Sequence, residues 1–306
     1  VLSMGLLAHL AERYPGARFT IACGAPAAPL FGAVPGLDRV LVVEKRSWHR
    51  HWLALWSACA TTWWDLVVDL RGSALAWALP ARSRRILRGL DGRHHRVEEI
   101  ATLFGVEPPP APRLWLSQED RAAAADILPG GADILAVGPT ANWGGKQWPG
   151  DRFAALVRHA TAEDGILPGA RVAVLGAEAE RDMAGKVLEA VPRDRIVDLI
   201  GRPLPLAAAC IARSTLFVGN DSGLMHIAAA TGTPTLGLFG PSPEWRYRPW
   251  GPHCAVARTE ESYEALVGAP GFDHRSQASL MTGLSVEVAY EALAKLYANV
   301  KDAPDD

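Results

Sequence analysis

The sequence of 306 residues lacks any apolar run that approaches the roughly 20 residues needed to cross a bilayer. It also lacks clustered cysteines, because its four cysteines are widely scattered and none has Cys-x-x-Cys spacing. They are Cys23, Cys59, Cys210 and Cys254. Such cysteines indicate reduced thiols in a cytoplasmic protein, and they argue against a disulfide framework or a zinc site.

A strong excess of charge of either sign is also missing. The 31 Lys and Arg residues against 33 Asp and Glu residues leave a formal net charge of −2. A dedicated nucleic-acid-binding protein would usually be clearly basic, so we expect no nucleic-acid partner.

What the sequence does contain is enough apolar material for two ordinary cores, since 49% of its residues are hydrophobic. In the first third of the chain, helical patterns at residues 3–14 and 47–61 alternate with strand patterns at residues 18–23, 39–43 and 65–70. Strands that alternate with helices predict an α/β fold with doubly wound parallel sheets.

A proline-rich segment at residues 107–112 is the clearest linker in the chain. We therefore predict a first domain at residues 1–110 and a second at residues 111–285, followed by a terminal helix and tail at residues 286–306. Apolar runs predict the strands of the second domain. They lie at residues 134–137, 171–175, 195–199, 215–218 and 235–239.

The most informative stretch is the βαβ pattern at residues 215–239, in which a polar loop at residues 219–223 joins a strand to an alanine-rich helix. Parallel α/β sheets bind ligands at the carboxyl ends of their strands, which is where this loop lies. The free N–H groups and the dipole of the helix start suit an anion.

Five residues around this helix start form the predicted site. Gly223 lets a ligand approach the backbone, and Ser222 and His226 lie four residues apart on one helix face. Taken singly, Asp221 could be only a helix cap and His226 only a core histidine. Together, in a loop that follows a strand, they favour a ligand site. The predicted residues are Asp221, Ser222, Gly223, Leu224 and His226.

Two further loops follow strands of the same domain. The first carries Thr140, Asn142 and Lys146 among glycines, and this combination of donors, positive charge and flexible backbone suits a diphosphate. The second carries Glu178 and Glu180, and a carboxylate just beyond such a strand often accepts from ribose hydroxyls. Either glutamate could instead be a solvated residue of a helix start.

The first domain contains two unusual patterns. Trp48, Trp52 and Trp56 recur every four residues, which favours a stripe that packs in the core, with an amphipathic surface for a lipid or a membrane as the alternative. The segment at residues 82–96 is rich in arginine, and guanidinium groups suit anionic ligands. The candidate ligand-binding residues of this domain are Asp69, Arg71, Arg84, Arg85 and Arg88.

The stretch GNDSGLMHIAAATGTPTLGLFGPSPEWRYRPWG at residues 219–251 resembles the C-terminal signature of glycosyltransferase family 9, the ADP-heptose:lipopolysaccharide heptosyltransferases. The resemblance implies the GT-B fold, in which two Rossmann-like domains face a cleft and the last helix crosses back to the first domain. Lys146 matches the family's Lys-x-Trp-Pro pattern, and Glu180 matches the spacing of its nucleoside-binding glutamate. The residues that match are Asn142, Lys146, Glu180, Asp221, Ser222, Gly223 and His226.

In this family an Asp that follows the first strand is the proposed catalytic base. Neither that strand nor that Asp is present here, so we interpret the chain as clipped, with its base upstream of Val1.

The resemblance further implies transfer of heptose from ADP-heptose to an anionic lipopolysaccharide-core or other glycan acceptor. Asp69, Arg71, Arg84, Arg85 and Arg88 of the first domain are then the candidate acceptor residues. Lys146, the helix N–H groups and a protonated His226 would stabilise the leaving diphosphate, and Asp221 would bind a sugar hydroxyl or cap the helix. No metal or other cofactor is expected, because protein positive charge takes the metal's role in such enzymes. The expected location is the cytoplasm, with peripheral contact at the inner face of the inner membrane. Two alternatives are a GT-B nucleotide-sugar epimerase and a non-enzymatic nucleotide-sugar-binding protein.

Overall fold

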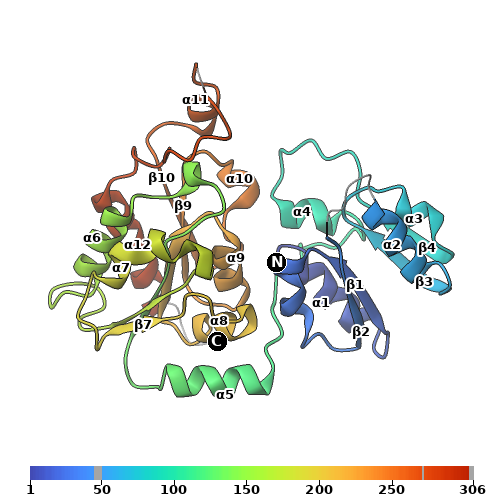
Figure 1. Cartoon of the computed structure of the whole chain (residues 1–306), viewed down its shortest axis with the longest axis horizontal. Coiled ribbons are helices and arrows are strands. Elements are labelled where there is room, and N and C mark those ends of the chain that lie inside the picture. The colour runs from blue at the N-terminus through green and yellow to red at the C-terminus, as the bar shows by residue number, and fades with distance from the viewer. Residues whose placement is uncertain (45–49, 271, 303–306) are drawn as a thin grey trace. The chain divides into compact units, whose positions relative to one another are not determined.

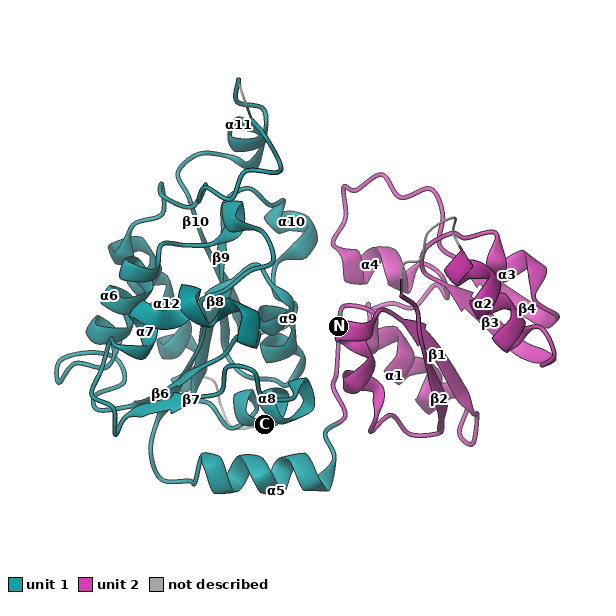
Figure 2. Cartoon of the chain, in the orientation of Figure 1, with its two compact units in different colours: residues 1, 116–306 teal, residues 2–115 magenta. Residues whose placement is uncertain are grey.

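A computed structural model describes residues 1–44, 50–270 and 272–302 of the chain (Figure 1). The chain divides into two compact units (Figure 2). The N-terminal unit comprises residues 2–115, and the C-terminal unit comprises residues 116–306 together with residue 1. This division falls five residues beyond the predicted boundary at residue 110.

The C-terminal unit is built on a six-stranded parallel sheet with the order β10-β9-β8-β5-β6-β7. The strands are β5 (Ile134–Gly138), β6 (Arg171–Val174), β7 (Ile196–Asp198), β8 (Leu216–Asn220), β9 (Thr235–Phe239) and β10 (Cys254–Arg258). The chain builds outward from β5 in one direction and from β8 in the other, so the strand order reverses between these two neighbours. The carboxyl ends of β5 and β8 therefore form a topological switch point, the place where ligands bind in open α/β sheets.

Helices cover both faces of this sheet, which makes the unit doubly wound (Figure 1). One layer contains α5 (Gln118–Ile127), α8 (Leu204–Ile211) and α9 (Gly223–Ala230). The other contains α6 (Gly150–Ala160), α7 (Arg181–Leu188) and α12 (Val286–Lys301). Shorter elements are η3 (Gly144–Lys146), η4 (Glu178–Glu180), α10 (Glu244–Tyr247) and α11 (Tyr263–Val267). Because helices shield both faces, every residue of β5, β8 and β9 is buried, which explains their continuous apolar sequences.

Glycines allow close packing at the carboxyl ends of the central strands. Gly219 of β8 pairs with Gly138 of β5 on one side and with Gly237 of β9 on the other. A Cβ on Gly219 would lie 2.8 Å from the Gly138 carbonyl oxygen and 2.9 Å from the Phe217 ring. The sheet end that leads into the site is therefore packed too closely for side chains at these positions.

The N-terminal unit has a less continuous sheet. β1 (Phe19–Cys23) pairs in parallel with β2 (Leu37–Val42), and β3 (Trp64–Asp69) pairs in parallel with β4 (Ala81–Ile86). These pairs form two separate sheets, and no residue in any of the four strands is fully buried. The helical elements are α1 (Met4–Arg13), η1 (Ala25–Phe31), α2 (Arg50–Cys59), α3 (Leu75–Ala78) and α4 (Arg96–Ala101).

Two local predictions need correction or qualification. The tryptophan stripe is not a core stripe, because Trp56 is 40% exposed and Cys59 is the only fully buried residue of α2. Trp48 lies outside the described residues. Helix α12 packs against β9, β10 and α6 within the C-terminal unit, and its crossing to the other unit stays a prediction.

Among the described residues, no helix has both the length and the apolar character needed to cross a membrane.

Candidate functional site

The centre of the candidate site is an ion pair at the switch point of the C-terminal sheet. Lys146 ends the short turn η3 after β5, and Asp221 directly follows β8. The Lys146 Nζ atom lies 2.7 Å from Asp221 Oδ2, and the two side chains are 27% and 8% exposed. A buried carboxylate is stable only when a partner compensates its charge, and Lys146 is that partner.

The start of helix α9 lies beside this pair and has no side-chain cap within the part of the chain that is described. Ser222 occupies the cap position with an extended backbone, and its buried Oγ atom has no hydrogen-bond partner in that part. Gly223 is exposed, and a Cβ placed on it would meet nothing within 4 Å. The first N–H groups of α9 are therefore open to an anionic ligand.

Three further predicted residues lie near this helix start. Leu224 and His226 are half-buried in the first two turns of α9, and the His226 backbone N–H donates to the Ser222 carbonyl at 3.5 Å. Asp221 does not cap the helix, because its carboxylate pairs with Lys146 instead. The structure thus brings together Lys146, Asp221 and the start of α9.

Thr140 and Glu180 form a second pair, which joins the ends of β5 and β6. The hydroxyl of buried Thr140 donates to Glu180 Oε2 at 2.7 Å, and the Ala177 N–H donates to the same oxygen at 3.0 Å. Glu178 instead accepts two hydrogen bonds from the Arg181 guanidinium, at 2.7 and 2.9 Å. These bonds lower the pKa of the exposed Glu178 carboxyl. Of the two candidate glutamates, Glu180 is therefore the one fixed at the end of β5.

Asn220 is a residue of this site that the sequence analysis missed. Its side chain is fully buried, its amide nitrogen donates to the Pro139 carbonyl at 2.8 Å, and its amide oxygen accepts from the Trp148 N–H at 3.0 Å. It therefore ties β8 to both ends of the loop that carries Lys146. Its position as a polar residue at the end of an apolar strand was the sequence feature that could have identified it. Asn142, which was predicted, is exposed in this loop.

The candidate acceptor residues lie in the N-terminal unit, and two of them have local structural roles. The Asp69 carboxylate accepts from the Arg71 and Ser73 N–H groups, at 2.8 and 2.6 Å, and so closes a turn. The Arg84 guanidinium donates to the carbonyls of Ala76, Leu79 and Ala81. Arg84 is thus engaged within its own unit, which argues against its predicted contact with an acceptor.

The other candidate cations are exposed. Arg71, Arg85 and Arg88 all reach solvent. Arg85 lies over the Phe104 ring at 5.8 Å, and Arg88 lies over the Trp77 ring at 5.4 Å. The positive charges of these three arginines are therefore accessible to an anionic acceptor.

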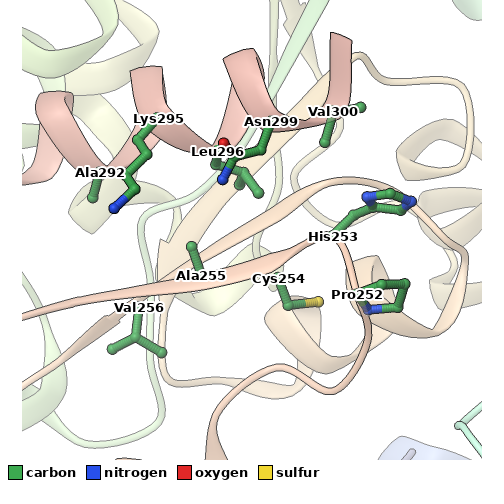
Figure 3. A pocket seen from close by; sticks show the side chains of 10 residues that line it. All are labelled: Pro252, His253, Cys254, Ala255, Val256, Ala292, Lys295, Leu296, Asn299 and Val300. Atoms are coloured by element: carbon green, nitrogen blue, oxygen red, sulfur yellow. The ribbon is translucent and has the colours of Figure 1, made fainter. Parts of the chain in front are cut away.

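A separate cavity of about 260 Å³ lies between β10 and α12 (Figure 3). Lys295 and Asn299 line it from the helix, and Cys254 lines it from the first residue of β10. Burial raises the pKa of the Cys254 thiol to about 12. Because Cys254 begins a parallel strand, the cavity lies at the amino ends of the sheet and does not belong to the site described above.

Within the described ranges, no group of three His, Cys, Asp or Glu residues is arranged to hold a metal ion.

Comparison with known proteins gives a consistent result. The sequence model of glycosyltransferase family 9 (heptosyltransferase) matches residues 92–268. Lipooligosaccharide heptosyltransferase 2 of Haemophilus influenzae is 32% identical over 176 residues, which are 55% of this chain and 49% of that protein. Lipopolysaccharide heptosyltransferase 1 of Pseudomonas aeruginosa is 26% identical over 272 residues, 77% of this chain and 74% of that protein. The chain spans about half the length of the first of these relatives.

Solved structures resemble the whole chain. A glycosyl transferase family 9 protein from Veillonella parvula has a TM-score of 0.77 at 19% identity, over 97% of this chain and 93% of that one. ADP-heptose lipopolysaccharide heptosyltransferase II of Escherichia coli has a TM-score of 0.72 at 20% identity, over 98% and 95%. The predicted GT-B fold is confirmed by these neighbours.

Proposed function

The chain belongs to glycosyltransferase family 9, and from this we propose that it transfers a heptose from ADP-heptose to a lipopolysaccharide-core-type acceptor. The family match, which covers residues 92–268, includes every candidate donor-site residue. The names of the relatives, all heptosyltransferases, support heptose as the sugar. An E. coli heptosyltransferase whose structure was solved with ADP supports adenine as the base.

The observation that carries the proposal is the Lys146–Asp221 pair beside the uncapped start of α9. Transfer of a sugar leaves a nucleoside diphosphate whose negative charge grows as the glycosidic bond breaks. The α9 N–H groups and the Lys146 ammonium would meet this charge at the place where it develops. Asp221 would hold Lys146 in place and accept a hydrogen bond from a sugar hydroxyl.

The nucleoside would bind at the neighbouring carboxylate. Thr140 fixes one oxygen of Glu180 at 2.7 Å, which leaves the other oxygen to accept from ribose hydroxyls. The acceptor hydroxyl needs a general base, which we do not assign to any residue of this chain. Cations of the N-terminal unit, Arg71, Arg85 and Arg88, would attract an anionic acceptor.

We further propose peripheral contact with the inner face of the inner membrane, in the cytoplasm. Trp56 Nε1 donates to the Ala78 carbonyl at 3.1 Å, so Trp56 adjoins helix α3, which carries Trp77. Trp56 and Trp77 are 40% and 60% exposed, and Arg88 lies over the Trp77 ring. Exposed tryptophans beside arginines suit an anionic lipid interface.

Calorimetric titration of ADP and UDP tests the donor site. We expect ADP to bind more tightly than UDP, and Lys146→Ala to weaken ADP binding by roughly ten- to a hundredfold, because one charge-assisted contact contributes roughly 1.5–3 kcal/mol. Glu180→Gln should weaken ADP binding, whereas Glu178→Gln, its matched control, should not. Absence of ADP binding by folded protein would refute the donor site. ADP binding without heptose transfer would favour a nucleotide-sugar-binding protein.

A further inference from the structure

The loop that carries Lys146 is held by a segment far along the chain, residues 276–284, which we call the strap. Several hydrogen bonds join the two. Before Lys146, Trp143 Nε1 donates to the Ser276 carbonyl at 2.8 Å, and the Gly144 N–H donates to Gln277 Oε1 at 2.9 Å. The Gly145 carbonyl accepts from the Leu280 N–H at 3.0 Å. After Lys146, Trp148 Nε1 donates to the Leu284 carbonyl at 2.9 Å. The strap therefore contacts the loop on both sides of Lys146.

The two segments approach more closely than side chains would allow. A Cβ on Gly144 would lie 2.1 Å from the Gln277 carbonyl oxygen. Only glycine fits this position, because the backbone of the strap fills the space that a side chain would need. The backbones of the loop and the strap are therefore in direct contact at Gly144.

The strap is fixed at its far end. Met281 and Leu284 are both 1% exposed and belong to the core of the C-terminal unit. Ser285, the next residue, caps α12 by accepting from the Val288 N–H at 3.2 Å. The strap can therefore act as a rigid support for the loop.

Two side chains of the strap bond to the backbone at the turn that carries Lys146. Ser279 Oγ donates to the Gln147 carbonyl at 2.5 Å, just after the turn, and Gln277 Oε1 accepts from the Gly144 N–H at its start. In that turn the Lys146 N–H donates to the Trp143 carbonyl at 3.0 Å and the Gln147 N–H donates to the Gly144 carbonyl at 2.9 Å. The Gly144 N–H makes no bond within the turn and donates instead to Gln277 Oε1. The amide oxygen of Gln277 thus fixes the first residue of the turn whose last residue is Lys146.

We propose that Gln277 is a positioning residue for Lys146: its hydrogen bond to Gly144 holds η3 in the conformation that places the ammonium at Asp221 and at the donor diphosphate. This inference rests on the proposed function, because it takes a nucleoside diphosphate as the ligand of Lys146. Gln277 itself touches neither the ion pair nor the nucleotide in this scheme.

A double-mutant cycle tests the proposal, with ADP and adenosine as the probes and the full chain as the protein. Gln277→Leu should raise the Kd for ADP about three- to tenfold, the effect of one hydrogen bond, and leave the Kd for adenosine unchanged. In a Lys146→Met background, Gln277→Leu should have little further effect on ADP binding. Gln118→Leu makes the same change at an exposed position in α5 and serves as the control.

The outcomes separate the two proposals. If Lys146→Met weakens ADP binding but Gln277→Leu does not, the positioning role is wrong and the donor site stands. If Gln277→Leu weakens ADP and adenosine alike, or has its full effect in the Lys146→Met background, its role is only structural and the inference fails. If the unaltered protein binds no ADP, the proposed function fails first. Thermal unfolding of each variant verifies that it is folded.

Discussion

The Lys146 ammonium lies 2.7 Å from the Asp221 carboxylate, although the two residues are 75 positions apart in the sequence. Each follows one of two neighbouring strands, β5 and β8, so the strand order of the sheet brings them together. The pair is asymmetric, because the Asp221 side chain is 8% exposed and that of Lys146 is 27% exposed. Asp221 therefore depends on Lys146 for compensation of its charge more than Lys146 depends on Asp221.

This asymmetry predicts unequal effects on stability. Lys146→Met should lower the free energy of unfolding by about 3 kcal/mol, the lower end of the cost of breaking a buried pair, because it leaves a buried carboxylate without its partner. Asp221→Asn should cost less, since Lys146 can reach solvent. The double variant should be more stable than Lys146→Met alone, and urea unfolding of all four proteins measures the coupling. Strictly additive effects would contradict a buried, interdependent pair.

Two glycines of the same βαβ unit should respond oppositely to one added methyl group. Gly219→Ala should lower the free energy of unfolding by about 1–3 kcal/mol, because the new Cβ would meet the Gly138 carbonyl at 2.8 Å. Gly223→Ala has open space and a helical position, so it should leave stability unchanged or raise it by about 0.5–1 kcal/mol.

For ADP binding we expect the opposite order, with Gly223→Ala more harmful than Gly219→Ala. The Gly223→Ala methyl group stands at the open start of α9, where we propose that the diphosphate binds, and it should weaken ADP binding. Calorimetry and urea unfolding of the two variants provide both measurements. Unchanged ADP affinity in Gly223→Ala would mean that the diphosphate does not approach this residue.

Five of the six strands in the sheet of the C-terminal unit were predicted from the sequence, for a physical reason, whereas β10 (Cys254–Arg258) was missed. Fully buried parallel strands such as β8 and β9 consist almost entirely of apolar residues, and a polar loop with glycine marks the end of β8. The strand–loop–helix–strand pattern at residues 215–239 therefore carried both the fold and the location of the candidate site.

Patterns of exposure at partly buried elements were harder to interpret. The periodic spacing of Trp52 and Trp56 indicates a shared helix face but not whether protein covers that face, and Trp56 is 40% exposed. Strand β4 contains Arg82, Arg84 and Arg85, and these charges concealed its strand character. Arg84 is accommodated because backbone carbonyls nearby accept its donors.

Contacts between distant segments left no periodic signal at all. The bond from Gly144 to Gln277 spans 133 residues, and the strap has no helix or strand pattern to identify it. The choice between Glu178 and Glu180 likewise depended on side-chain partners, Arg181 for the first and Thr140 for the second. Such pairings follow from the assembled fold and not from local sequence.

The buried thiol of Cys210 predicts a pH dependence of stability. Burial is the largest cause that raises its pKa from 9.0 to about 11, against smaller opposing effects of Arg213 and Arg202. In the unfolded chain the thiol ionises near pH 9, whereas in the folded protein it stays protonated until about pH 11. Between these values the unfolded state binds fewer protons, so stability that is fully present below pH 9 is lost as pH rises toward 11.

Comparison with Cys210→Ala isolates this contribution from that of the other groups that titrate in alkaline solution. Across the window from pH 9 to 11, the unaltered protein should lose about 2 kcal/mol more of its free energy of unfolding than the variant does. Urea unfolding at pH 8, about 9.5 and about 11 measures the difference. Parallel pH profiles for the unaltered protein and Cys210→Ala would show that the thiol is not protected from ionisation.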